Sequence, residues 1–194
     1  MSEKPSEEMD AELIMDCKKG KRDAYNTLMD RWYQRVYNYA LRYTGDHHSA
    51  EHIAQTTFIQ VYRKIDHLKD VSKFKSWIYS IATNFCHSES RKKTSKLKLV
   101  TTTHELPQVA DFNHPEKIYN QEERGSVLRK ILSQISPEQR QVIIMKEYEG
   151  LKFREIAEAL KISENTVKAR LYYGLDAMKK IVNKNQWLKE MYYE

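Results

Sequence analysis

Glycine and proline are scarce in this sequence, which has 5 Gly and 4 Pro among 194 residues. Sheets joined by tight turns use both residue types often, because such turns need positive φ angles or a fixed φ. Charged residues make up 31% of the chain and hydrophobic residues 40%, a balance that suits amphipathic helices. We therefore expect an all-α protein, and the length favours two small helical domains, each of under about 100 residues.

Cysteine is almost absent, and long apolar runs are absent altogether. Cys17 and Cys86 lie in different expected helices without CxxC spacing, so we expect ordinary reduced side chains. No run of about 18 apolar residues exists, and the opening MSEKPSEEMDAE is acidic where a secretory signal is basic and then apolar. The expectation is a cytoplasmic protein with no stable membrane insertion.

Acidic residues are outnumbered by basic ones, and the formal net charge is +6. This charge permits binding to a polyanion, and the 13 Tyr and 3 Trp offer planar groups that can stack on unpaired bases. The segment RKKTSKLK concentrates Arg91, Lys92, Lys93, Lys96 and Lys98 with no acid among them. Two interpretations remain open: a solvated helix end whose cations complement the helix dipole, or a stripe that contacts phosphates.

Apolar residues recur at three- and four-residue steps in the N-terminal part, which predicts helices starting near residues 10, 22, 49 and 72. Residues 1–9 look like a disordered tail, and residues 10–95 a first domain. The fourth helix is expected to bury one stripe and to expose a polar face opposite it. The stripe comprises Phe74, Trp77, Ile78, Ile81 and Phe85, and the polar face comprises Ser76, Tyr79, Ser80, Thr83, His87, Ser90 and Arg91.

The helical periodicity stops from about Thr101 to Pro115, where TTTHELPQVADFNHPE is acidic and contains Pro107 and Pro115. We interpret residues 96–116 as a linker. A second domain follows over residues 117–184. Within it the tetrapeptide SPEQ, which starts at Ser136, has the pattern of a capping box with proline at the first helical position. Residues 185–194 form an extension to which the sequence assigns no role.

The segment KFREIAEALKISENTVKARL predicts two short helices around a tight break, as in a helix-turn-helix. Ala157 stands where the helices cross closely, Ile162 and Val167 stand at apolar plug positions, and Ser163 can cap the second helix. The first turns of such a helix can reach phosphates and base edges. A helical hairpin in a structural bundle is the competing interpretation. The outward residues are Asn165, Thr166, Ala169, Tyr172 and Tyr173, flanked by Lys168 and Arg170.

Three segments in this order, AEHIAQTTFIQVYRKI, FKSWIYSIATNF and SPEQRQVIIMKEYEGLKFREIAEALKISENTVKARL, resemble regions 2 and 4 of bacterial RNA polymerase sigma factors. The short segment between them resembles the extracytoplasmic function (ECF) group of that family. The resemblance spans roughly residues 10–182 and implies a region 2 helical bundle joined by a flexible linker to a region 4 helix-turn-helix. It also implies a promoter-specificity subunit that binds core RNA polymerase and promoter DNA, melts the DNA, serves a stress or envelope-related regulon and is held by an anti-sigma factor.

The resemblance implies three groups of site residues. The third helix is similar to the part of region 2 that docks on the polymerase clamp, the loop and helix over residues 66–91 to the part that melts the minus-ten element, and the second helix of the helix-turn-helix to the reader of the minus-thirty-five element. The polymerase-binding residues are His52, Gln55, Thr56, Ile59 and Arg63; the minus-ten residues are Lys69, Lys73, Tyr79, Thr83, Asn84, His87, Arg91, Lys92 and Lys93; the minus-thirty-five residues are Arg154, Ser163, Asn165, Thr166, Lys168, Ala169, Arg170 and Tyr173.

Two other functions compete with this hypothesis. A helix-turn-helix regulator that does not bind polymerase would explain the C-terminal half and leave the N-terminal half without a role. An enzyme would need a site, and His47, His48 and His52 around Glu51 lack the HExxH order. We therefore expect no catalytic residue, metal, cofactor or small-molecule substrate.

Overall fold

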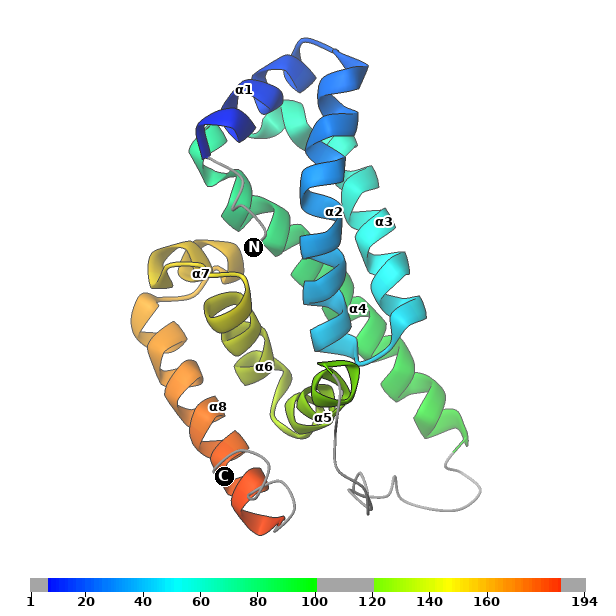
Figure 1. Cartoon of the computed structure of the whole chain (residues 1–194), viewed down its shortest axis with the longest axis vertical. Coiled ribbons are helices and arrows are strands. Elements are labelled where there is room, and N and C mark those ends of the chain that lie inside the picture. Colours follow the sequence, from blue (N-terminus) through cyan, green and yellow to red (C-terminus); the bar gives the residue numbers. More distant parts are fainter. Residues whose placement is uncertain (1–6, 101–120, 186–194) are drawn as a thin grey trace.

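The computed structural model of the chain describes residues 7–100 and 121–185, with side chains over residues 9–92 and 125–185, and these residues form helices without a strand (Figure 1). The expected all-α fold is confirmed. The N-terminal half contains α1 (Glu7–Lys18), α2 (Arg22–Thr44), α3 (His47–Lys64), the short 3₁₀ turns η1 (Ile65–His67) and η2 (Val71–Lys73), and α4 (Phe74–Val100). The C-terminal half contains α5 (Gln121–Gln134), α6 (Pro137–Ile143), the π-helical turn η3 (Ile144–Tyr148), α7 (Phe153–Leu160) and α8 (Glu164–Lys184).

Helix α4 runs further than the sequence predicts. It continues to Val100, through the first residues of the stretch expected to be a linker from residue 96. The segment KKTSKLK contains neither proline nor glycine and is rich in lysine, so nothing in it ends a helix. Residues 1–6 of the expected tail, the rest of the expected linker, the residues up to 120 and the extension from residue 186 lie outside the described residues. Residues 7–9, also expected to belong to the tail, are part of α1.

Trp32 of α2 ties three helices of the N-terminal half together. Its indole Nε1 donates a 3.0 Å hydrogen bond to the buried carboxylate of Asp10 in α1, and its ring meets the edge of Phe74 at the start of α4, with centroids 5.4 Å apart. Arg31 binds the other oxygen of the same carboxylate at 3.3 Å. Burying an indole with its N–H satisfied stabilises both the packing and the position of α4.

The C-terminal half contains the predicted helix-turn-helix. Gln139 donates from its backbone N–H to Ser136 Oγ at 3.2 Å and accepts in return through its side chain, so the capping box of α6 is present. Lys161 closes α7 in the left-handed conformation, with φ of 54°, where glycine would be unstrained. Gly174 lets α8 cross α6 closely, since a Cβ there would lie 2.7 Å from Ile143 Cδ1.

The two halves of the molecule share one apolar core. Helix α7 packs against α4, and α5 and η3 pack against α2, so that the C-terminal half lies along the side of α2 and α4 (Figure 1). Most core residues of both halves form one continuous cluster of buried side chains, and Val127, Ile131 and Val182 form a second, smaller one between α5 and α8. In this conformation the two helical domains are therefore packed on one another.

The packing of the two halves corrects the expected faces of α4. Tyr79 is fully buried and Thr83 and Ser76 are also buried, whereas the sequence placed them on an exposed polar face. Trp77, from the expected buried stripe, is only partly buried. The physical reason is that α4 lies between α2 and the C-terminal half, so two sides of it are covered, and helical periodicity alone describes a helix with one buried side.

Candidate functional site

The outward side of α3 carries an exposed apolar pair among polar residues, and we call this the α3 surface: His52, Gln55, Thr56, Ile59, Tyr62 and Arg63. Ile59 is 50% exposed and Tyr62, one turn further, is 64% exposed. The polar members are exposed, except for the half-buried Thr56, whose hydroxyl donates to the carbonyl of His52 at 2.7 Å. Apolar side chains in such a polar rim are typical of a protein-binding surface.

Sequence reasoning missed Tyr62, although it stands three residues after Ile59 and therefore on the same helix face. Its ring packs edge-on against Tyr25 of α2, with centroids 5.0 Å apart, which holds it in place beside Ile59. A rigid aromatic ring that remains exposed is the side-chain type that most often carries binding energy at interfaces. The α3 surface is thus larger than the five residues the sequence predicted.

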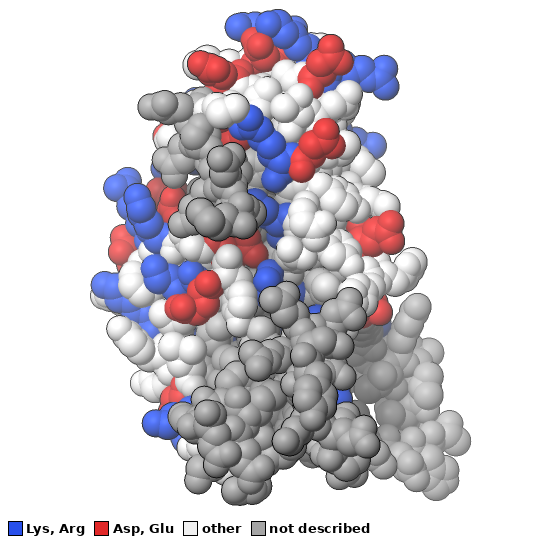
Figure 2. All heavy atoms as spheres, in the orientation of Figure 1, with Lys and Arg blue, Asp and Glu red and all other residues white. Residues whose placement is uncertain are grey.

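The start of α8 presents the predicted reading residues to solvent. Ser163 caps the helix by accepting from Thr166 N at 3.1 Å, as expected. Asn165, Lys168 and Ala169 are exposed, and Thr166 and Arg170 are half-buried. Tyr173 is exposed, and so are its neighbour Tyr172 and Arg154 of α7. Figure 2 shows Lys and Arg side chains along the side of the molecule where α7 and the start of α8 lie.

The predicted minus-ten residues fall into two groups. One group is accessible: Lys69, Lys73, Asn84, Arg91 and Lys92 are exposed. In the other group, Tyr79 and His87 contact the C-terminal half, and Thr83 is buried against Tyr39 of α2. The side chain of Lys93 lies outside the described residues. The structure therefore does not bring all of these residues to one open surface.

A cleft of about 670 Å³ lies between the loop after η1, the start of α4 and the end of α7. Asp70 fixes the loop by accepting from the backbone and hydroxyl of Ser72 at 3.0 and 2.6 Å, and these bonds lower its pKa. Lys69, Lys73 and Trp77 are in its lining. The α4 side of the cleft, with a planar ring and two cations, suits an unstacked base and its phosphate, whereas the α7 side adds the carboxylate of Glu158, 3.0 Å from Lys73 Nζ.

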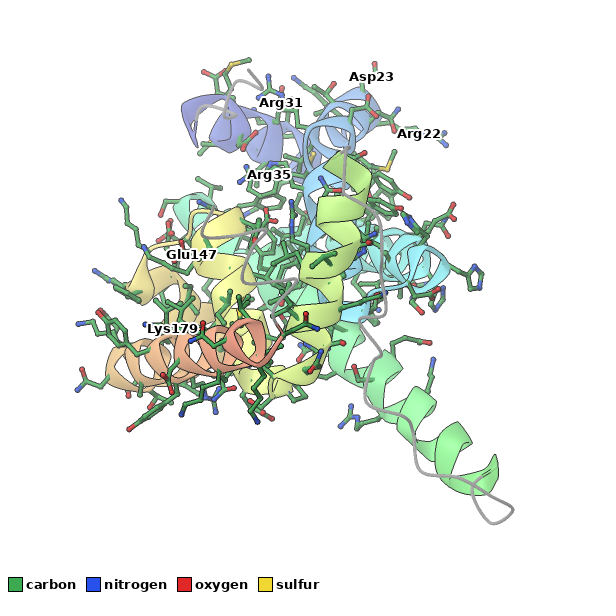
Figure 3. All side chains as sticks on the ribbon, turned by 60° about the horizontal axis from the view of Figure 1, so that its bottom comes forward. Arg22, Asp23, Arg31, Arg35, Glu147 and Lys179 are labelled. Carbon is green, nitrogen blue, oxygen red and sulfur yellow. The ribbon has the colours of Figure 1, made fainter. Side chains whose placement is uncertain are left out.

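The carboxylate of Glu149, just after η3, is buried between the two halves of the molecule. Its side chain accepts from the hydroxyl of Tyr79, lies 3.5 Å from Arg42 NH1, and lies 4.0 Å from Arg35 Nε. Burial raises the pKa of Glu149, and the bond from Tyr79 and the charges of Arg42 and Arg35 oppose that rise. Figure 3 shows Arg35 at the junction of the two halves.

Two further polar contacts join the halves near the end of α2. Arg140 of α6 donates to the carbonyl of Tyr43 at 2.8 Å, with its guanidinium over the ring of Tyr43. His87 Nε2 lies 2.8 Å from Gln141 Oε1. We call this set, centred on Glu149, the interdomain contact. Sequence reasoning missed it, and the only local signal is that Arg35 and Arg42 stand seven residues apart on one helix face.

Within residues 7–100 and 121–185, the side chains that are described contain no group of three His, Cys, Asp or Glu that could hold a metal ion. Of the histidines near the start of α3, His47 instead accepts from or donates to the hydroxyl of Tyr37 through Nδ1, at 2.7 Å. None of the helices in this described part is long and apolar enough to span a membrane.

Comparisons with known proteins match the two halves separately. Residues 28–96 match the family Sigma-70 region 2, and residues 126–178 match Sigma-70, region 4. The ECF RNA polymerase sigma factor SigW of Bacillus subtilis is 34% identical over 174 residues, which cover 86% of this chain and 93% of that protein. The ECF RNA polymerase sigma factor SigE of Mycolicibacterium smegmatis is 27% identical over 184 residues, covering 93% and 71%.

Solved structures share the fold. The structure of CnrH in complex with the cytosolic domain of CnrY matches with a TM-score of 0.71 at 16% identity, over 92% of this chain and 99% of that one. The sigma factor RpoE in complex with the anti-sigma factor NepR from Bartonella quintana matches with a TM-score of 0.61 at 19% identity, over 79% and 93%.

Proposed function

The chain belongs to the ECF group of RNA polymerase sigma factors, and from this premise we propose that its α3 surface binds core RNA polymerase while α4 and α8 engage the promoter. The observation that carries the proposal is the α3 surface, an exposed apolar pair inside the segment that matches region 2. A helix-turn-helix regulator would leave this matched half without a task. The protein would act in the cytoplasm, beside the polymerase.

The start of α8 is suited to the minus-thirty-five element. A capped helix N-terminus offers free N–H groups to a phosphate, and Asn165 and Arg170 can each make paired hydrogen bonds to a base edge. Lys168 supplies charge for the backbone without sequence preference. The exposure of Asn165 and Lys168 supports this role, since neither has to move to meet the major groove.

The side of the cleft that carries Lys69, Lys73 and Trp77 is suited to the minus-ten element. An extruded base could stack there, and the two lysines could hold the phosphates on either side. Stacking is worth about 1–3 kcal/mol per base, so capture of a few bases offsets the cost of opening the duplex. Melting of this kind needs no nucleotide hydrolysis and no catalytic residue.

An anti-sigma factor is the third partner that we propose. The RpoE structure described above contains a sigma factor bound to an anti-sigma factor, and CnrH is bound to the cytosolic domain of CnrY. The promoters served by this chain would belong to a stress or envelope-related regulon, as the family resemblance implies.

The test is co-elution of the purified protein with core RNA polymerase in gel filtration without DNA. Wild type should co-elute, Ile59→Asp should not, and Gln55→Ala should be weakened. Met15→Asp is the matched control, because Met15 is equally exposed but lies on α1. A wild-type protein that fails to co-elute while still binding duplex DNA would favour the regulator.

A further inference from the structure

Two carboxylates of the C-terminal half form ion pairs with basic side chains of the N-terminal half. Glu149 lies on Arg35 and Arg42 of α2, and Glu158 of α7 lies 3.0 Å from Lys73 Nζ. The cations belong to the side of the N-terminal half on which Tyr79 and His87 meet the C-terminal half, and Lys73 is itself a proposed DNA ligand. Acidic groups of the same chain thus occupy positions next to cations that could otherwise meet a nucleic acid.

The geometry around Glu149 is that of a site for an oxyanion with two oxygens. Arg42 faces one carboxylate oxygen, and Arg35 and the hydroxyl of Tyr79 face the other. A phosphodiester presents two non-bridging oxygens that share one negative charge, and the donor types that bind carboxylates through arginine also bind phosphates. Arg35 is held in place by its guanidinium over the ring of Trp32, at 4.5 Å.

We propose that Arg35, Arg42 and Tyr79 form a phosphate site for the opened DNA strand, and that Glu149 occupies this site in the free protein. The C-terminal half then competes with DNA for the side of α2 and α4 that it covers. This inference rests on the proposed function and assigns its regulation to a contact within the chain.

The ion pairs of Glu149 add little net stability, so the interdomain contact can open. Burial of Glu149 raises its pKa, so the attraction of Arg42 and Arg35 does not fully offset the removal of the carboxylate from water. Buried ion pairs of this kind add little net stability because desolvation cancels most of the Coulomb energy. The side chains of both arginines keep about a quarter of their surface exposed, which lets water return as the halves part.

The first experiment compares Glu149→Lys with Glu147→Lys. Glu147 is an exposed residue of η3 (Figure 3), so both variants change the charge equally, two residues apart, and only one enters the contact. The probe is a short fluorescein-labelled single-stranded DNA of mixed sequence, followed by anisotropy at low salt. Glu149→Lys should bind at least about tenfold more tightly than Glu147→Lys, because like charges drive the halves apart. Equal affinities would overturn the proposal.

The second experiment reverses the charge of Arg42, the partner of Glu149 in this ion pair. Arg42→Glu should also open the contact, seen as a larger radius of gyration in small-angle X-ray scattering, but it should not bind the strand more tightly than wild type. The charge-swapped double variant, Arg42→Glu with Glu149→Lys, should return to the compact form. If both single variants gain affinity equally, the C-terminal half merely covers DNA-binding residues elsewhere, and the phosphate site is wrong.

Co-elution with core RNA polymerase separates this inference from the proposed function. Neither Glu149 nor Arg42 belongs to the α3 surface, so both single variants should still bind core polymerase, which also shows that they are folded. Retained core binding with no difference between Glu149→Lys and Glu147→Lys contradicts the inference alone. Failure of wild type to bind core polymerase contradicts the proposed function.

Discussion

The α3 surface and the buried side of α4 are both proposed binding surfaces of one domain, yet they differ in solvent exposure. Tyr62 on α3 is 64% exposed, while Tyr79 on α4 is fully buried beneath the C-terminal half. The α3 surface is ready to bind a partner as it stands, whereas the side of α4 that holds Tyr79 must first be uncovered. This difference gives the order of the proposed events: core polymerase can bind the closed protein, whereas the opened DNA strand binds only after the two halves have parted.

The largest expected effect concerns the α3 surface. Tyr62→Asp should weaken binding to core polymerase by about thirtyfold or more, as expected for an aromatic residue at the centre of an interface. Tyr172→Asp is the matched control, because Tyr172 is similarly exposed but lies on α8. Titration of core polymerase against the labelled protein measures both. Equal losses in the two variants would mean that the surface has been placed on the wrong helix.

A smaller effect is expected at α8 with duplex DNA that contains the minus-thirty-five element. Asn165→Ala should cost about 1–3 kcal/mol against the preferred sequence and relax the choice of base at one position. Lys168→Ala should weaken all sequences alike and reduce the slope of log affinity against log salt by about 1. Lys179→Ala, exposed further along the same helix (Figure 3), should change neither quantity. Unaltered base preference in Asn165→Ala would remove α8 as the reader.

Removing the hydroxyl of Tyr79 tests whether its hydrogen bond holds the interdomain contact closed. Tyr79→Phe removes the hydrogen bond to Glu149 and should destabilise the closed form by about 1–3 kcal/mol, since a buried carboxylate loses a donor. Tyr39→Phe is the control: this hydroxyl is also buried, but it lies 2.8 Å from Thr83 within the N-terminal half. Small-angle scattering should show opening for Tyr79→Phe only. Opening in both variants would indicate general loosening instead.

The smallest effect is expected with pH. The pKa of Glu149 is raised in the closed form, whereas in the open form it returns toward the ordinary value of 4.5, so the closed form binds the proton more tightly. Closure should therefore strengthen as pH falls from neutral toward that range, and Glu149→Gln should remove the dependence. The groups facing Glu149 are Arg35 and Arg42 from α2 and Lys75 and Tyr79 from α4.

Burial and the neighbouring carboxylate of Glu149 raise the pKa of Tyr79 well above its ordinary value of 10.0, so its hydroxyl keeps its proton in this range. His87 faces Gln141 in the same contact, so His87→Gln is the control for any contribution of a histidine. Scattering curves recorded across the pH range measure the closed fraction. A closed form that weakens on acidification, with His87 replaced, would contradict the role given to Glu149.

The sequence predicts much of this fold because most of its helices bury a single side. The helix-turn-helix, the caps at Ser136 and Ser163, and the outward residues of α8 follow from local spacing and capping rules. Ile59 was placed correctly for the same reason. Helix α4 could not be predicted in the same way, because it is covered on two sides and the second cover comes from the other half of the chain.

The contact of Glu149 could not be predicted from local sequence patterns. Its partner Tyr79 lies 70 residues earlier, and nothing near either residue distinguishes them from an ordinary surface acid and an ordinary half-buried tyrosine. The end of α4 was misplaced for a different reason, since the lysine-rich segment has no helix stop and composition alone suggested a change there. Long-range contacts and uncapped helix ends are the parts that need a structure.

Hydroxyl-radical footprinting of the tyrosines tests the central comparison most directly, in the free protein and after core RNA polymerase is added. The account predicts that in the free protein Tyr62 is oxidised rapidly and Tyr79 is protected, and that core polymerase then protects Tyr62. Rapid oxidation of Tyr79 in the free protein, or of Tyr62 in the presence of saturating core polymerase, would contradict it.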